Sequence, residues 1–148
     1  MTGTDFLCSN LALLAWRDGF SEGLNGMLAV AHTIKRRVDA GWYNGDWASV
    51  LSNHKKWSAR TEPYSEEVPD PRIYSFQCLL QEVNGIFNGS RQDDITVPKD
   101  TVLSRPAPGA LYYGRLDAIT SEHFLLEIAR KPELHPRVAQ VGMLTFFA

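Results

Sequence analysis

The chain has 148 residues, of which 44% are hydrophobic, 11% aromatic and 22% charged. This length and composition are typical of one globular domain and exclude a disordered, collagen-like or coiled-coil chain. The formal net charge is −2, with 15 Lys and Arg against 17 Asp and Glu, so the chain lacks the positive charge with which nucleic-acid-binding proteins neutralise phosphates. We therefore expect a single domain over residues 1–148 and no nucleic-acid partner.

The most apolar part of the chain lies near its beginning. The run over residues 11–16 is far shorter than the ~20 residues that cross a bilayer, so we expect no membrane span. Residues 6–16 have the length of the apolar part of a signal peptide, but residues 1–5 carry no basic side chain and no small-x-small cleavage site follows. We therefore expect no signal peptide and interpret this segment as a helix.

Two amphipathic helices are predicted at the start of the chain. Leu7, Leu11 and Leu14 recur at helical spacing and predict a helix over about residues 5–18, which Gly19 and Gly23 end. A second apolar stripe predicts a helix over residues 24–38, where the cations of residues 35–37 suit the negative end of the helix dipole. Polar groups between residues 17 and 22 would then lie at a corner between two helices, a favourable place for chemistry.

The rest of the chain alternates loops with shorter elements. Residues 41–68 lack a sustained apolar period, which predicts surface loops with one short helix at 47–51. Asp70 and Pro71 are typical of a helix start and predict a third long helix that ends before Asn88 and Gly89. A fourth is expected over 121–130, and residues 111–113 and 143–147 predict two strands that pair. The expected fold class is α+β, mainly α, with a small β-sheet.

The cysteines and histidines do not predict a metal centre. Cys8 and Cys78 each lie among apolar neighbours, where a free thiol behaves as a small hydrophobic group, and two thiols alone cannot form a tetrahedral zinc site. The four histidines are far apart in the sequence and show no metal-ligand spacing. We therefore expect two buried thiols and no metal.

Four segments of the chain, taken in order, carry a family resemblance. Residues 15–31 read AWRDGFSEGLNGMLAVA, and the helix that follows ends in Arg-Arg-Val at residues 36–38. Lys56-Trp57-Ser58, then GALYY at residues 109–113, then VGMLTFF at residues 141–147 complete the set. Together they resemble the SleB-like cell-wall hydrolase family, typified by spore cortex-lytic enzymes, whose first pattern is approximately E-A-R-G-E-x-x-x-G-x-x-A-V-A. The chain departs from the family where Leu144 replaces a His and where residues 97–108 form an apparent insertion.

The resemblance implies a lysozyme-like domain that cuts the MurNAc-GlcNAc linkage of peptidoglycan glycan strands, chiefly as a lytic transglycosylase. It implies no metal and no organic cofactor. By analogy with lytic transglycosylases, the catalyst is the acid at the end of the first helix. A gapless alignment places Asp18 on the family's first Glu and Glu22 on its second. Without an export signal, the expected source is a phage, and the protein would act on the host cell wall from the periplasm or as part of a virion.

The expected chemistry requires a carboxylic acid that stays protonated near neutral pH. A Glu side chain has an ordinary pKa of ~4.3, so burial beside apolar groups such as Trp16, Phe20 and Trp57 would have to raise it. If both acids reach a cleft, one neutral acid and one charged stabiliser form the two-carboxylate arrangement of glycosidases. If one does, the 6-hydroxyl of the substrate can act as nucleophile. Glu22 is the first candidate and Asp18 the second; alternatively, both are ordinary charged residues at helix ends.

Substrate binding is assigned to aromatic and hydroxyl side chains. Aromatic faces stack on sugar rings, while hydroxyls and amides bind the N-acetyl groups, and the candidates are Trp57, Ser58, Tyr112 and Tyr113. Because neighbouring side chains on a strand point to opposite faces, only one of Tyr112 and Tyr113 is expected to face the groove.

A second function, from a different class, stays open at this point. Asp18 and Leu144 stand where the family has a Glu and a His. These two departures favour a lysozyme-like protein without strong catalysis, which would bind the cell wall as a structural component of a phage tail or virion. The products of peptidoglycan digestion would distinguish the two functions.

Overall fold

Helices make up most of the structure, a computed structural model that describes residues 3–54, 69–91, 110–114 and 123–148. The helices are α1 (Gly3–Gly19), the 3₁₀ turn η1 (Phe20–Glu22), α2 (Gly23–Asp39), α3 (Trp47–Ser52), α4 (Tyr74–Phe87) and α5 (His123–Ala129), and the strands are β1 (Tyr112–Gly114), β2 (Arg137–Val141) and β3 (Leu144–Phe147). The expected α+β, mainly α class is confirmed. Within these residues, none of the helices combines the length and hydrophobicity that a bilayer crossing needs.

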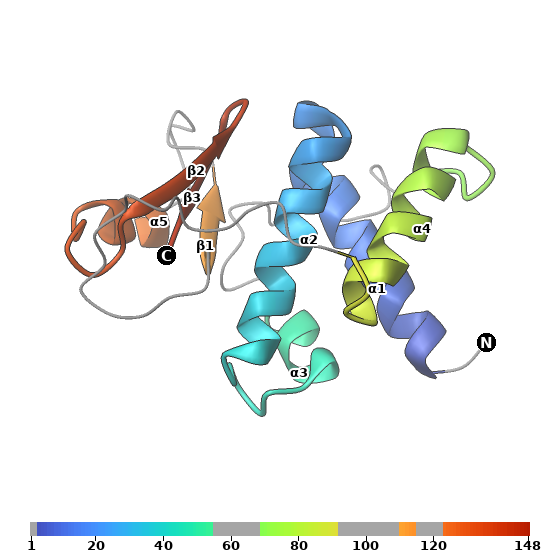
Figure 1. Ribbon diagram of the computed structural model, residues 1–148, viewed down its shortest axis with the longest axis horizontal. Coiled ribbons are helices and arrows are strands. Elements are labelled where there is room, and N and C mark those ends of the chain that lie inside the picture. The colour runs from blue at the N-terminus through green and yellow to red at the C-terminus, as the bar shows by residue number, and fades with distance from the viewer. Residues whose placement is uncertain (1–2, 55–68, 92–109, 115–122) are drawn as a thin grey trace.

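Three long helices form one side of the molecule, and the sheet lies on the other. In Figure 1, α2 lies between the sheet and the pair formed by α1 and α4. Each of the three long helices contacts the other two, and α2 also contacts β1 and β2. The side chains with no exposed area at the centre include Leu11, Ile34, Leu79, Val83 and Phe146. The core therefore joins the helices to the sheet through α2.

The sheet is antiparallel, with β3 between β1 and β2. Tyr113 pairs with Phe146 across β1 and β3, so the predicted pairing of the two strands is confirmed. The strand β2 was not predicted; it joins β3 through a tight turn at Gly142. Two cations of α2 tie the helix to the start of β1, because Arg36 and Arg37 donate to the backbone carbonyls of residues 110 and 111. Both side chains are buried and lie in the last turn of α2, as predicted, so these hydrogen bonds come in addition to the interaction with the helix dipole.

The prediction for the third long helix was wrong at its start. α4 begins at Tyr74, because the carboxylate of Asp70 accepts hydrogen bonds from the backbone N–H and guanidinium of Arg72 and holds a turn there. Its predicted end was correct: the helix ends at Phe87, and Gly89, with φ +81°, follows the C-cap residue Asn88.

The cysteine prediction holds for one thiol. Both cysteines are free, but only Cys8 is buried, while Cys78 is partly exposed. The thiol of Cys8 donates to the side-chain oxygen of Asn84 at 3.9 Å. Burial, together with the charge of Asp5, raises the pKa of Cys8, which keeps it a thiol near neutral pH.

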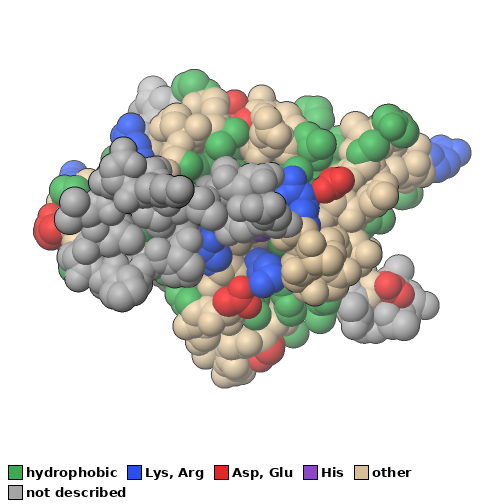
Figure 2. All heavy atoms as spheres, viewed as in Figure 1, with side chains coloured by type: hydrophobic (Ala, Val, Ile, Leu, Met, Phe, Trp, Pro, Cys, Tyr) green, Lys and Arg blue, Asp and Glu red, His purple; other side chains and the backbone are tan. Residues whose placement is uncertain are grey.

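Charged side chains are mixed on the surface. On the described part of the face in Figure 2, basic and acidic groups lie interspersed, with hydrophobic side chains between them. This agrees with the nearly balanced counts of Lys and Arg against Asp and Glu.

Candidate active site

The corner between α1 and α2 holds both predicted acids. α1 ends at Gly19, the turn η1 spans Phe20–Glu22, and α2 begins at Gly23, as the glycines predicted. Gly19 allows close approach here, because a Cβ on it would lie 2.7 Å from the Cα of Met27. The break in the helix separates the two acids, so Asp18 and Glu22 have different surroundings.

Asp18 points into the interior, where it joins side chains from distant parts of the chain. Its side chain is 4% exposed, and that of His54, two residues after the end of α3, is 2% exposed. Oδ2 of Asp18 lies 2.9 Å from Nε2 of His54 and accepts a hydrogen bond of 2.5 Å from the hydroxyl of Tyr113 on β1. These contacts connect α1, α3 and the sheet in one buried polar cluster.

The Asp18 carboxylate is ionised in this cluster. Burial alone would raise its pKa, but the hydrogen bond and charge of His54, the hydrogen bond of Tyr113 and the charge of Arg17 outweigh burial and lower the pKa of Asp18 below its ordinary value. A general acid must hold a proton near neutral pH. Asp18 therefore does not fit the expected role of a neutral proton donor, and the physical reason is the set of donors that face it.

Glu22 lies at the surface, against the turn between β2 and β3. Its side chain is partly exposed, and Oε1 accepts a hydrogen bond of 3.2 Å from the hydroxyl of Ser21. Oε2 occupies the space beside Gly142, since a Cβ on Gly142 would lie only 1.8 Å from this oxygen. Gly142 also has φ +57°, which disfavours any other residue. The turn is therefore shaped to accommodate the Glu22 carboxylate.

A cavity of about 490 Å³ adjoins this carboxylate, between α2 and the β2–β3 turn. It is lined by Asn25, Leu28, Ala29, His32, Gln140, Val141 and Gly142. The Gln140 amide is held in place, because it donates to the backbone oxygen of Gly142 and accepts from the hydroxyl of Thr145. Nε2 of His32 lies 2.8 Å from the guanidinium of Arg91, which also pairs with Glu82. Amide groups thus line a ligand-sized space next to a carboxylate.

Neither of the two predicted sugar-binding tyrosines lines this cavity. Tyr113 packs in the core against Asp18, as expected for one of the two tyrosines. Tyr112 is partly buried against the rings of Trp42 and His135 and is not among the residues that line the cavity. Trp57 and Ser58 lie outside the described residues, so their predicted role stays a prediction.

The sequence interpretation missed several residues of this region. His54 was not predicted to belong to a site, because no spacing pattern connects it with Asp18, 36 positions away. Gly142 had a usable signal, because a glycine between two short apolar segments is typical of a hairpin turn.

No protein family, curated protein or solved structure matches this chain. Among the side chains that the structure describes, no three His, Cys, Asp or Glu residues gather closely enough to hold a metal ion.

Proposed function

We propose that this protein is a lysozyme-like, peptidoglycan-degrading glycosidase that cleaves the MurNAc-GlcNAc linkage, with Glu22 as the general acid. The observation that carries the proposal is the position of the Glu22 carboxylate, at the corner after α1 and beside the cavity between α2 and the β2–β3 turn. The family resemblance supplies the substrate class, since it places an acidic residue at this corner.

The arrangement favours a lytic transglycosylase over a two-carboxylate hydrolase. Asp18 is buried and bonded to His54 and Tyr113, so Glu22, which lies against Gly142 at the edge of the cavity, is the one of the two acids that is left for catalysis. Glu22 would donate its proton to the glycosidic oxygen as the bond to C1 of MurNAc breaks. The 6-hydroxyl oxygen of the same MurNAc would then bond to C1 and return its proton to Glu22. The products are a free GlcNAc hydroxyl and a 1,6-anhydro end, and the acid is regenerated.

The cavity offers groups that suit an N-acetyl sugar. Its volume of about 490 Å³ falls within the usual range for small-ligand sites of about 300–1,000 Å³. Asn25 and Gln140 line it with amides that can bind an N-acetyl group. Phe20, next to the acid in η1, and Met143, next to Gly142, are 56% and 46% exposed and provide apolar surface for sugar faces.

Digestion of purified peptidoglycan tests this function. The protein would be incubated with sacculi, and the soluble fragments would be examined by mass spectrometry. We expect fragments with 1,6-anhydro ends. Fragments with reducing ends would contradict the transglycosylase step, and a folded protein that releases no fragments would contradict the glycosidase itself.

A non-catalytic role is the second candidate, and the state of Asp18 favours it. The residue that aligns with the first acid of the family is ionised and engaged in the core. In this case the protein would bind the wall as part of a phage tail or virion. Sedimentation of the protein with sacculi, without release of fragments, would support this role. As an enzyme, it would be a phage product that acts on the host cell wall.

The Gly142→Ala variant tests the placement of Glu22. The new methyl group would occupy the space of Oε2 and displace the carboxylate, so we expect cleavage to fall on the order of tenfold. The positive φ would also lower the free energy of unfolding by about 1 kcal/mol. Chemical denaturation and fragment release would measure the two effects.

Gly89→Ala is the matched control for this variant. Gly89 also has positive φ, but no atom lies within 4 Å of a Cβ built on it. It should lose similar stability and keep full activity. Equal activity of both variants would show that the contact with Gly142 does not position Glu22.

A further inference from the structure

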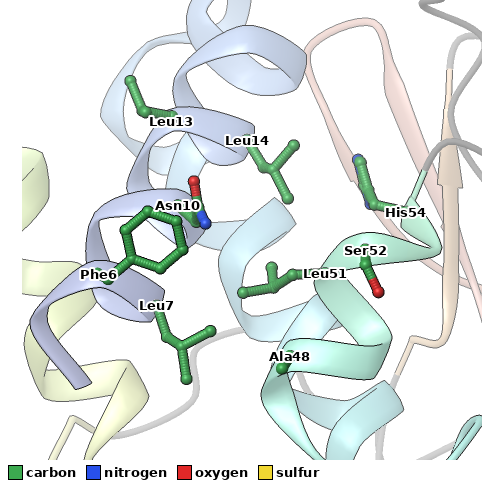
Figure 3. Close-up of a pocket in the computed structure, with 9 residues that line it drawn as sticks. All are labelled: Phe6, Leu7, Asn10, Leu13, Leu14, Ala48, Leu51, Ser52 and His54. Carbon is green, nitrogen blue, oxygen red and sulfur yellow. The ribbon is translucent and has the colours of Figure 1, made fainter. Parts of the chain in front are cut away.

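Two cavities in the described part of the structure have a histidine in their walls. The one between α1 and α3 has a volume of about 460 Å³, and Figure 3 shows its largely apolar lining, with His54 at one side. His54 is engaged with Asp18 in the interior. The cavity beside Glu22 has two amides and His32 in its wall instead. Because a few placed polar groups orient a ligand in its site, the second cavity is the one in which a histidine can serve the proposed function.

One face of α2 runs along this cavity from the proposed acid to His32. Glu22 directly precedes the helix, and Asn25, Leu28, Ala29 and His32 line the cavity at helical spacing. The distance along a helix from position 22 to position 32 is about 15 Å. His32 therefore lies at the other end of this row of side chains, remote from the bond that Glu22 would cleave.

Arg91 determines the charge of His32. Nη1 of Arg91 lies 2.8 Å from Nε2 of His32. A guanidinium has donors only, so Arg91 donates and Nε2 accepts, which requires that Nε2 carries no proton. A second proton on the ring would remove this hydrogen bond and place a cation against the guanidinium. The contact therefore favours an uncharged ring, 3% exposed, whose proton is on Nδ1.

Arg91 is itself held in position from α4. Its Nε donates to Oε2 of Glu82 at 2.8 Å, and its backbone N–H donates to the carbonyl of Gly85 at 3.0 Å. Gly85 leaves room for this close return of the chain, because a Cβ on it would lie 3.2 Å from the Cβ of Arg91. The planar guanidinium can donate to Glu82 and His32 at the same time, so one side chain connects α4 to the cavity wall on α2.

The charged groups near His32 come from three elements. On the α4 side they are Arg91 and its partner Glu82, and Glu22 lies at the β2–β3 turn. On α2 itself, Arg36 is one turn further along and donates to the backbone carbonyl of residue 110. The residues of β2 that line the cavity are uncharged. Arg91 makes the direct contact with the ring, so its effect on the charge of His32 is the largest of these.

We propose that Arg91 is a positioning residue that keeps His32 uncharged in the cavity wall, where the wall binds an uncharged part of the glycan such as an acetamido group. This inference rests on the proposed function and extends it to a part of the substrate remote from the acid. A buried charge without a partner is unfavourable, so a protonated ring would turn toward water or Glu82 and leave its place in the wall. Arg91 prevents this change at mildly acidic pH.

NMR of the imidazole nitrogens tests the charge of His32 in the whole protein. We expect an unprotonated Nε2 and a protonated Nδ1 from pH 8 down to pH 5.5, although an ordinary histidine is half protonated at about pH 6.5. In Arg91→Met the donor is lost and Glu82 remains, so the ring should be protonated at pH 5.5. A wild-type ring that is charged, or that carries its proton on Nε2, at pH 7 would overturn the proposal, whatever the digestion of sacculi shows.

Binding of chitotriose, a soluble and uncharged N-acetyl glycan, tests the role of the wall. By isothermal titration calorimetry, Arg91→Met should bind it about fivefold more weakly than the wild type at pH 5.5. The difference should be smaller at pH 8, where the ring is uncharged in both proteins. Absence of binding by the wild type, or equal affinities at both pH values, would overturn the proposal. Sacculi that stay intact while both His32 results are as expected would instead contradict the general acid.

Three further variants separate positioning from a structural role. Glu82→Gln removes the ion pair but leaves the hydrogen bond from Arg91 to His32, so it should bind as the wild type does. Arg91→Lys keeps a cationic donor and should bind more tightly than Arg91→Met at pH 5.5. Arg130→Met, which removes a guanidinium that is 71% exposed beside Glu127, is the matched control and should bind as the wild type does. Circular dichroism would confirm folding. Binding by Glu82→Gln as weak as by Arg91→Met would overturn the role of His32.

Discussion

Replacing Glu22 by Gln is expected to lower the rate of peptidoglycan cleavage by about 10²–10⁴-fold, the usual contribution of a general acid. The amide has nearly the same shape and can still lie beside Gly142, but it has no proton to give to the glycosidic oxygen. Because Glu22 is partly exposed and accepts a hydrogen bond from the neighbouring Ser21, the free energy of unfolding should change by less than about 0.5 kcal/mol. Fragment release from sacculi and chemical denaturation would measure the two quantities.

Glu127→Gln is the matched control for this experiment. Glu127 lies on α5, is 60% exposed and pairs with Arg130, so it has the same chemistry far from the cavity. We expect this variant to keep full activity and nearly full stability. If Glu22→Gln cleaves as fast as Glu127→Gln and the wild type, Glu22 is not the acid, and the proposed function loses the observation on which it depends.

The local patterns in the sequence were sufficient for most of the helices. The apolar stripe over residues 24–38 placed α2 to within about one residue at each end, because a helix must bury one face at a fixed period. The glycines at 19 and 23 likewise marked the corner that separates the two acids. The local sequence pattern was less informative for β2, because the residues of Arg137–Val141 differ in burial and follow a proline. This segment is a strand because it pairs with β3.

The site itself depended on contacts that no local pattern encodes. The carboxylate of Asp18 contacts His54, 36 positions away in the sequence, and Tyr113, 95 positions away. Only the packing of α3 and β1 around α1 brings these three residues together. The sequence predicted a helix corner with two acids but could not decide which acid is buried. Local context therefore identified the corner, and the tertiary contacts determine that Asp18 is buried while Glu22 is partly exposed.

The ionised state of Asp18 predicts a specific dependence of stability on pH. Because the folded pKa is lowered, the carboxylate stabilises the folded state above its unfolded pKa of about 3.9, and this stabilisation is lost as the pH falls through the folded pKa. This contribution to the free energy of unfolding of the wild type should therefore stay nearly constant around neutral pH and decrease below about pH 4. Chemical denaturation at pH 7, 5 and 3 would follow this change.

Asp18→Asn should remove that contribution. The neutral amide cannot serve as a charged acceptor for both His54 and Tyr113. The free energy of unfolding at pH 7 should therefore fall by about 3 kcal/mol, at the lower end of the cost of breaking a buried charged pair. The difference from the wild type should shrink as the pH falls below about 4, because protonation of this carboxyl then favours the unfolded state. Asp39→Asn is the control, because Asp39 is 60% exposed in its pair with Lys35. This variant should lower the free energy of unfolding by less than about 1 kcal/mol. If the two variants lose the same stability, and the difference does not depend on pH, then Asp18 is not the ionised link between α1, α3 and the sheet.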